Sequence, residues 1–362
     1  MAYSPIPLPP RAFAKAGLLA ALLTAAFVLG WETYWRGQGF PISYNDDESL
    51  WASKRKLIYA ATPARPVLIG SSRVKFDVDL DTWTSLSGQR PVMLAIAGAS
   101  PRPVLTDLGN DPAFRGTVIV GVTEGLFFTP AGARQENWAM DRLKAYPKWS
   151  LAQQLSFRLN HLLESKLVLL DDEKLTVSSF LEELPLPNRP EVFEPPHFPR
   201  KFSFTTFGRQ SQMSAEFVAD TAMQGQMKGV WRHLGAGQQK HGPGGDTLLA
   251  ILQATKRSVD QIRARGGQVL FVRCPSSGLY RQMETRNFPR AEYWDRLLTY
   301  THTPGIYYAD YPALAGFECP EWSHLSPRDA ATFTRALIPI IEQKMGWSIL
   351  AHPVAVAPAA VR

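Results

Sequence analysis

The chain has few of the residues that build metal sites or disulfide frameworks: two cysteines and seven histidines among 362 residues. Because structural zinc sites gather several such ligands at close spacing, this shortage argues against one. No internal repeat runs through the sequence, and no nucleic-acid-binding module accompanies the net charge of +7. The basic surface could instead attract an anionic polymer or membrane headgroups.

The amino end carries a long apolar stretch. Residues 16–31 are apolar or small and uncharged, with two cations before them and Tyr34 and Trp35 after them. A membrane span needs about 20 residues, and the interfacial Trp and Tyr bring residues 16–35 to that length. The positive flank predicts a cytoplasmic tail of residues 1–15. We therefore expect a single-pass inner-membrane protein with its globular domain in the periplasm or outside the cell.

Two other interpretations of this stretch are open. A cleaved signal peptide has the same charge pattern and apolar core, although no Ala-x-Ala site directly follows the core here. A buried globular helix is less expected at the extreme amino end with this flanking. We favour an uncleaved anchor, one folded domain over residues 36–345 and a loose tail over residues 346–362, which are rich in Ala, Val and Pro.

Short apolar runs alternate with helical stretches along the domain. Strands are expected at Pro66–Gly70, Val92–Ala97, Thr117–Val122, Gln268–Val272 and Ile306–Ala309, and helices at residues 151–170, 246–265 and 327–345. Ser326 is the expected N-cap of the last helix, with Pro327 at its first position. Alternation of this kind implies right-handed parallel crossovers. The expected fold class is α/β, a three-layer flavodoxin-like sandwich with a parallel sheet, preceded by one transmembrane helix.

The alternation breaks between about residues 129 and 245, which we interpret as an insertion. Residues 184–199 are crowded with prolines and should form an extended connection. The segment that follows interleaves cations with aromatic residues, among them Trp231. It could hold a carbohydrate or an anionic polymer, because aromatic faces stack on sugars and cations attract carboxylates. A solvated lid over a small core is the alternative.

Two distant motifs together indicate hydrolase chemistry. The first expected strand breaks at Gly70 into Ser71 and Ser72, and Glu321 and His324 stand just before the last helix. A serine hydroxyl becomes a good nucleophile when a histidine takes its proton and a carboxylate orients the imidazole. The alternative is that the serines merely close a strand, with a surface acid and a polar residue near a helix start.

The order of these segments, with a second strand ending at Gly98 and a third ending near Thr123, resembles the SGNH (GDSL-like) hydrolase superfamily and its membrane-anchored branch. The resemblance implies that Ser72 is the nucleophile and His324 its base. Glu321, where the family has aspartate, would orient His324. The backbone N–H groups of Ser72 and Gly98 would form the oxyanion hole. Thr123 would replace the family's asparagine.

Three further residues lie near the expected site. Arg73, beside the nucleophile, could contact an anionic group of the substrate, with an outward surface arginine as the default. Cys274 and Cys319 both belong at the carboxyl edge of the expected sheet. In an oxidising compartment they could form a disulfide. Two buried free thiols are the equal alternative.

The membrane-anchored members of the superfamily suggest a function. Single-pass SGNH proteins that face outward resemble the alginate and cellulose O-acetylation proteins and the D-alanyl transferase of teichoic acid assembly. Those proteins work beside a multispanning acyltransferase of the MBOAT type. By that resemblance we expect O-acetylation of an exported polysaccharide through an acyl-serine, with that polysaccharide and an MBOAT-type protein as partners, and without cofactor, metal or nucleic acid. A periplasmic carbohydrate acetyl esterase, or an inactive glycan-binding or scaffold subunit of a membrane synthesis complex, are the alternatives.

Overall fold

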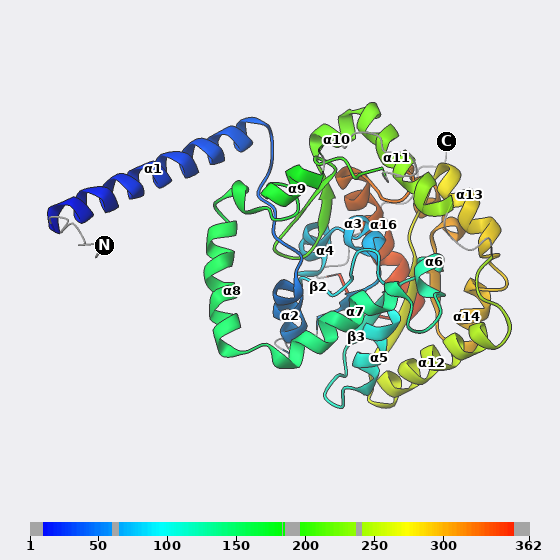
Figure 1. Ribbon diagram of the computed structural model, residues 1–362. Coiled ribbons are helices and arrows are strands. Elements are labelled where there is room, and N and C mark those ends of the chain that lie inside the picture. The colour runs from blue at the N-terminus through cyan, green and yellow to red at the C-terminus, as the bar shows by residue number, and fades with distance from the viewer. Residues whose placement is uncertain (1–9, 60–64, 183, 185–195, 237–240, 351–362) are drawn as a thin grey trace, which may run out of the picture.

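A five-stranded parallel sheet organises the protein (Figure 1). The computed structural model describes residues 10–59, 65–182, 184, 196–236 and 241–350. The strands are β1 (Val67–Ile69), β2 (Val92–Met93), β3 (Thr117–Gly121), β6 (Gln268–Arg273) and β7 (Gly305–Tyr307), in the order β2-β1-β3-β6-β7. Every pairing between them is parallel. The expected α/β class with a parallel sheet is therefore confirmed.

Both faces of the sheet are covered by hydrophobic clusters. Successive residues of a strand point to opposite faces, so each strand contributes to both clusters. In β1, Val67 and Ile69 enter one hydrophobic cluster and Leu68 enters the other. Helices α5 (Arg102–Asn110) and α12 (Gly245–Ala264) contribute to the first cluster, and α4 (Leu80–Ser87) and α16 (Pro327–Met345) to the second. The continuous apolar strands are those expected of a parallel sheet covered on both sides.

The other helices connect or flank this centre. They are α2 (Glu48–Leu57), α3 (Ser72–Asp77), α6 (Glu124–Phe127), α7 (Arg134–Ala145), α8 (Leu151–Glu164), α9 (Val177–Glu182), α10 (Ala215–Ala219), α11 (Thr221–Ala236), α13 (Gly278–Asn287), α14 (Trp294–Thr301), α15 (Pro312–Ala315) and the 3-10 turns η1 (Tyr146–Lys148), η2 (Val168–Leu170) and η3 (Tyr308–Asp310). The expected last helix is confirmed, with Ser326 Oγ accepting from Asp329 N. The expected helix over residues 151–170 ends at Glu164, and the separate turn η2 follows at Val168–Leu170.

The strand predictions differ from the structure in three places. The expected strand Ile306–Ala309 is found as β7 at Gly305–Tyr307, and Tyr308–Asp310 form η3 instead. Strand β2 ends at Met93 instead of Ala97, although Leu94 N and Ile96 N still donate to the main chain of the β1 segment. Within the insertion, β4 (Ser203–Thr205) and β5 (Ser211–Met213) form an antiparallel pair that the sequence did not predict. Most of the expected extended connection over residues 184–199 lies outside the described residues.

Helix α1 (Pro10–Gly37) projects from the globular part (Figure 1). Its Phe13–Gly37 stretch is long and apolar enough to cross a membrane, and none of its most apolar window is buried. The carboxyl end of α1 is docked: Glu32 accepts hydrogen bonds of 3.0 Å from both Val168 N and Leu169 N. Trp35 also stacks on Phe180 at 5.5 Å between ring centroids. The last turns of α1 thus belong to the globular unit.

Candidate active site

The turn after β1 presents Ser72 at the first position of α3. Gly70 makes this turn possible, because a Cβ at that position would lie 2.4 Å from Val74 Cγ2. Ser71 is the N-cap residue and is buried, whereas Ser72 is half-buried. The strand-turn-helix geometry therefore places a reachable hydroxyl at the carboxyl edge of the sheet, where α/β proteins usually bind their ligands.

The structure brings Ser72, His324 and Glu321 into one hydrogen-bonded line. His324 Nε2 lies 2.8 Å from Ser72 Oγ, and His324 Nδ1 lies 2.8 Å from Glu321 Oε1. His324 and Glu321 are both buried. The donor at each imidazole nitrogen depends on the tautomer, and a carboxylate on Nδ1 favours the tautomer whose Nε2 can accept the serine proton.

The loop from Glu321 to His324 folds so that the Glu321 carboxylate reaches the imidazole three residues later. Glu321 Oε1 also accepts from His324 N at 2.6 Å, so the side chain folds back inside its own turn. Trp322 adopts the left-handed region at φ 82°, and its carbonyl accepts from Ser277 N at 2.8 Å. Gly278 leaves room for the Trp322 indole, since a Cβ there would lie 2.4 Å from Nε1. The conformation of this loop thus places the glutamate carboxylate beside the imidazole.

Trp231 of α11 joins the site in a role that the sequence did not reveal. Its indole N–H donates to Glu321 Oε2, the carboxylate oxygen that His324 leaves free. The His324 ring stacks on Phe76 at 4.4 Å, and Phe202 and Trp231 lie 6.1 and 5.9 Å from it. Trp231 had stood out only as an aromatic residue for sugar stacking. No local spacing signals a contact between residues so distant along the chain.

The expected oxyanion residues flank the β1 turn on both sides. Ile96 N donates to Gly70 O at 3.0 Å, which places the Gly98 loop beside that turn. Gly98 has φ 68°, and a Cβ there would lie 2.7 Å from a ring carbon of Trp138. On the other side, Thr123 Oγ1 lies 2.8 Å from Ser71 Oγ. The Thr123 hydroxyl therefore pairs with the neighbouring serine.

Arg73 does not occupy the position expected for a substrate contact. It is 2% exposed and pairs with Glu284 at 2.6 Å. Glu284 also pairs with Arg273 at 2.6 Å, and Arg273 with Glu124 at 2.8 Å. Burial raises the pKa of the Glu284 carboxyl, but the charges of Arg273 and Arg73 outweigh it and hold that pKa below its ordinary value. The sequence missed this buried ion cluster, which ties together the ends of three strands.

The two cysteines are free thiols, so the disulfide considered for Cys274 and Cys319 is not formed. Both are buried, and burial raises the pKa of each thiol. The nearby Asp77 carboxylate adds to this shift. Thiols of this kind are poor nucleophiles, which leaves Ser72 as the candidate nucleophile here. Within the described residues, no three His, Cys, Asp or Glu side chains form a group that could hold a metal ion.

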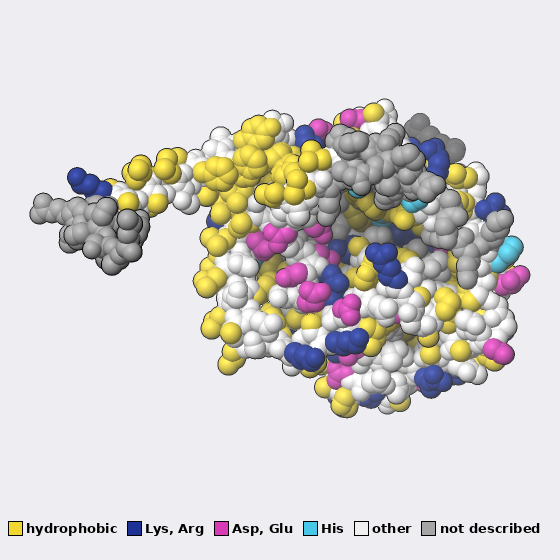
Figure 2. Space-filling view, in the orientation of Figure 1, with side chains coloured by type: hydrophobic (Ala, Val, Ile, Leu, Met, Phe, Trp, Pro, Cys, Tyr) yellow, Lys and Arg dark blue, Asp and Glu magenta, His cyan; other side chains and the backbone are white. Residues whose placement is uncertain are grey.

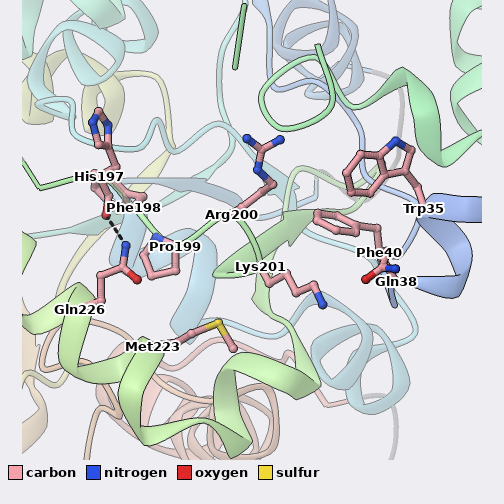
Figure 3. Close-up of a pocket in the computed structure, with 10 residues that line it drawn as sticks. All are labelled: Trp35, Gln38, Phe40, His197, Phe198, Pro199, Arg200, Lys201, Met223 and Gln226. Atoms are coloured by element: carbon pink, nitrogen blue, oxygen red, sulfur yellow. Dashed lines mark hydrogen bonds between the residues drawn. The ribbon is translucent and has the colours of Figure 1, made fainter. Parts of the chain in front are cut away.

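A cavity of about 530 Å³ opens between the end of α1 and α11 (Figure 3). It is lined by Trp35, Gln38, Phe40, His197, Phe198, Pro199, Arg200, Lys201, Met223 and Gln226. Gln226 Nε2 donates to His197 O at 3.2 Å across one wall. Phe198 lies edge-on to Trp231 at 5.7 Å between ring centroids. The Phe198 ring therefore connects the cavity wall to Trp231, which donates to Glu321.

In comparisons with known proteins, no family model and no curated protein matched the chain. The resemblance carried by the sequence motifs stays a prediction.

Proposed function

We propose that this protein is an extracytoplasmic SGNH-type acyltransferase that works through an acyl-serine on Ser72. The observation that carries the proposal is the line from Ser72 Oγ through His324 to Glu321, with 2.8 Å at each step. It lies at the edge of a sheet with the order β2-β1-β3-β6-β7. That order, with apolar clusters on both faces, also supports the three-layer flavodoxin-like sandwich.

The geometry supports a two-step acyl transfer. Ser72 Oγ attacks the carbonyl carbon of an ester while its proton passes to His324 Nε2, and the Glu321 carboxylate stabilises the imidazolium. The backbone N–H groups of Ser72 and Gly98, with Thr123 alongside, would hold the oxyanion. Collapse of the tetrahedral intermediate expels the leaving alcohol, which takes the proton from His324. An acceptor hydroxyl then gives its proton to His324, attacks the acyl carbon and restores Ser72.

Two features favour transfer to a polysaccharide over hydrolysis. Helix α1, as an uncleaved single anchor with its amino end in the cytoplasm, would hold the site beside the inner membrane, where an MBOAT-type partner could deliver acyl groups. The cavity beside α11 offers the exposed ring of Phe198 as a stacking face for sugars, and Lys201, which pairs with Glu216 at 2.7 Å, lies on the same lining. O-acetylation of an exported polysaccharide is the reaction that uses both features.

The test uses the full chain in detergent, because the docked end of α1 makes truncation after Trp35 disruptive. Wild-type protein should release acetate from p-nitrophenyl acetate and be labelled at Ser72 by a fluorophosphonate. Ser72→Ala and His324→Ala should lose both. Ser71→Ala distinguishes the two serines: the Ser71 hydroxyl meets Thr123 instead of His324, so Ser72 should still be labelled.

Acceptor oligosaccharides added in parallel separate the outcomes. Acetylated sugar from wild-type protein, absent from Ser72→Ala, supports the transferase. Rapid acetate release that no acceptor diverts favours a periplasmic carbohydrate esterase. A folded wild-type protein that neither labels nor releases acetate, alone or with its membrane partner, contradicts the enzyme and favours a glycan-binding or scaffold subunit.

A further inference from the structure

Helix α8 turns its leucines outward. Leu151, Leu155, Leu159, Leu162 and Leu163 are between 52% and 78% exposed, and α8 has no buried residue. Their spacing of three and four residues places them on one side of the helix. Figure 2 shows the hydrophobic side chains at the margin of the molecule where α8 lies. An apolar stripe of this size on a surface helix marks a contact with something other than water.

The opposite side of α8 faces the protein, and it is the more polar side. Gln154, Phe157, His161 and Glu164 are half-buried there. Gln154 Oε1 accepts from Lys56 Nζ at 2.7 Å, and Glu164 Oε1 accepts from Asn45 Nδ2 at 3.1 Å. A helix packed on its own core would show the reverse arrangement. The outer side of α8 is therefore built for an apolar environment.

The position of α8 is fixed relative to α1. Helix α8 leads directly into η2, whose first two N–H groups bond to Glu32 of α1. Arg36 of α1 also donates to Lys166 O, two residues past α8, at 2.6 Å. In Figure 1, α8 runs crosswise to α1 and lies on the side toward which α1 projects. A bilayer crossed by α1 would meet the outer side of α8.

We propose that α8 lies in the membrane surface as a second bilayer contact, with its leucines in the acyl-chain boundary. This inference rests on the membrane anchoring by α1 that is part of the proposed function. Charge agrees with a lipid surface: the exposed charged residue of α8 is Arg158, with exposed Lys148 before the helix and Lys166 after it. Cations at these positions suit anionic headgroups.

The apolar faces of α1 and α8 adjoin, which favours lipid over a second copy of the chain as the occupant. The exposed leucines of α1, such as Leu18 and Leu22 at 63% and 59%, need the same environment as those of α8. Because η2 joins the two helices at one end, a single bilayer surface covers both apolar faces without any further partner. Helices with an apolar face and a polar opposite face bind in this orientation, in the plane of the interface.

The experiment places a nitroxide on three variants of the full chain, each with one added cysteine, in vesicles of phosphatidylcholine and phosphatidylglycerol. Leu159→Cys reports the outer side of α8, and Asn160→Cys is the matched control on an exposed polar position next to it. Leu22→Cys reports α1. The unmodified chain measures background, since Cys274 and Cys319 are buried. Collision rates with lipid-soluble oxygen and with a water-soluble nickel chelate are compared at each site.

We expect the oxygen-to-nickel ratio at Leu159→Cys to exceed that at Asn160→Cys severalfold and to approach the ratio at Leu22→Cys. Equal, water-like ratios at positions 159 and 160, with a lipid-like ratio at position 22, would overturn the inference while leaving the anchor intact. A water-like ratio at position 22 as well would instead contradict membrane anchoring by α1, which is part of the proposed function. Spin–spin broadening at position 159 that disappears when unlabelled protein is added would show that a second copy of the chain contacts α8. That result would also overturn the inference.

Discussion

Replacing Trp231 by phenylalanine should weaken the site without dismantling it. The substitution keeps an aromatic ring against His324 but removes the N–H that donates to Glu321 Oε2. Glu321 is fully buried, so its carboxylate depends on donors from the protein. Leaving a buried acceptor unsatisfied costs about 1–3 kcal/mol. The two hydrogen bonds from His324 to Oε1 remain, so the carboxylate loses its orientation only in part.

The expected result is a fall in the rate of fluorophosphonate labelling and in kcat/KM for small esters. At 1.36 kcal/mol for each factor of ten, a loss of this size corresponds to roughly a 5- to 150-fold decrease. It should stay smaller than the decrease caused by Ser72→Ala, which removes the attacking atom. Labelling rates at fixed pH, together with urea unfolding of the same samples, separate a loss of reactivity from a loss of fold.

Trp83→Phe is the matched control. Trp83 is a fully buried indole in the cluster on one face of the sheet, and its Nε1 has no hydrogen-bond partner among the described residues. Its replacement also trades an indole for a smaller ring in the core but touches no residue of the proposed triad. Its labelling rate should therefore match wild type. If Trp231→Phe is stably folded and labels at the wild-type rate, Trp231 does not position Glu321 and the reasoning is refuted.

Three further predictions concern stability and loop shape. Asp46 pairs with buried Lys75 at 2.5 Å and Arg209 at 2.6 Å; burial raises the pKa of its carboxyl, but the two cations outweigh it and hold that pKa well below its usual range. Asp46→Asn should therefore lower the free energy of unfolding by about 3–5 kcal/mol at pH 7. The difference from wild type should shrink as acid protonates Asp46, and equal urea midpoints at pH 7 would contradict it. Burial lowers the pKa of Lys54 from 10.5 to about 7, so the unfolded chain binds a proton that the folded chain releases between those values. Wild-type stability should rise with pH across that window relative to Lys54→Met, by up to about 5 kcal/mol; parallel pH profiles in thermal unfolding would exclude this. Gly278→Ala should cut fluorophosphonate labelling at least tenfold, because its Cβ would displace Trp322, whereas Gly316→Ala, with open space around it, should label like wild type.

Much of the framework was readable from local patterns. Buried strands that end in small residues and the Ser326 cap before α16 are short-range signals, because neighbouring residues alone determine them. The same signals placed Ser72 and His324 at the edge of the sheet. The structure brings their side chains to 2.8 Å, a distance that no local pattern could supply.

The missed features depend on partners far away in the chain. From the sequence, a charged residue such as Arg73 in the first turn of a helix is expected to be exposed. It is buried because it pairs with Glu284, which is 211 residues away. Trp231 reaches Glu321 only because α11 folds back over the edge of the sheet. Strands β4 and β5 have three residues each, too short for an alternating pattern to be distinguished. Each miss reflects tertiary contacts overriding a weak local signal.

The docked end of α1 leaves no flexible linker between this helix and the globular part. A domain on a flexible linker samples distances that grow with the square root of linker length. Here Glu32 and Trp35 fasten the helix to η2 and Phe180, and no slack chain separates them from the globular part. If α1 spans the bilayer, Ser72 stays at one height above it and searches only by lateral diffusion and by rotation about the membrane normal. If the proposed transferase activity also holds, the distance of the acceptor from the membrane would decide whether it can reach Ser72, before any side chain recognises it.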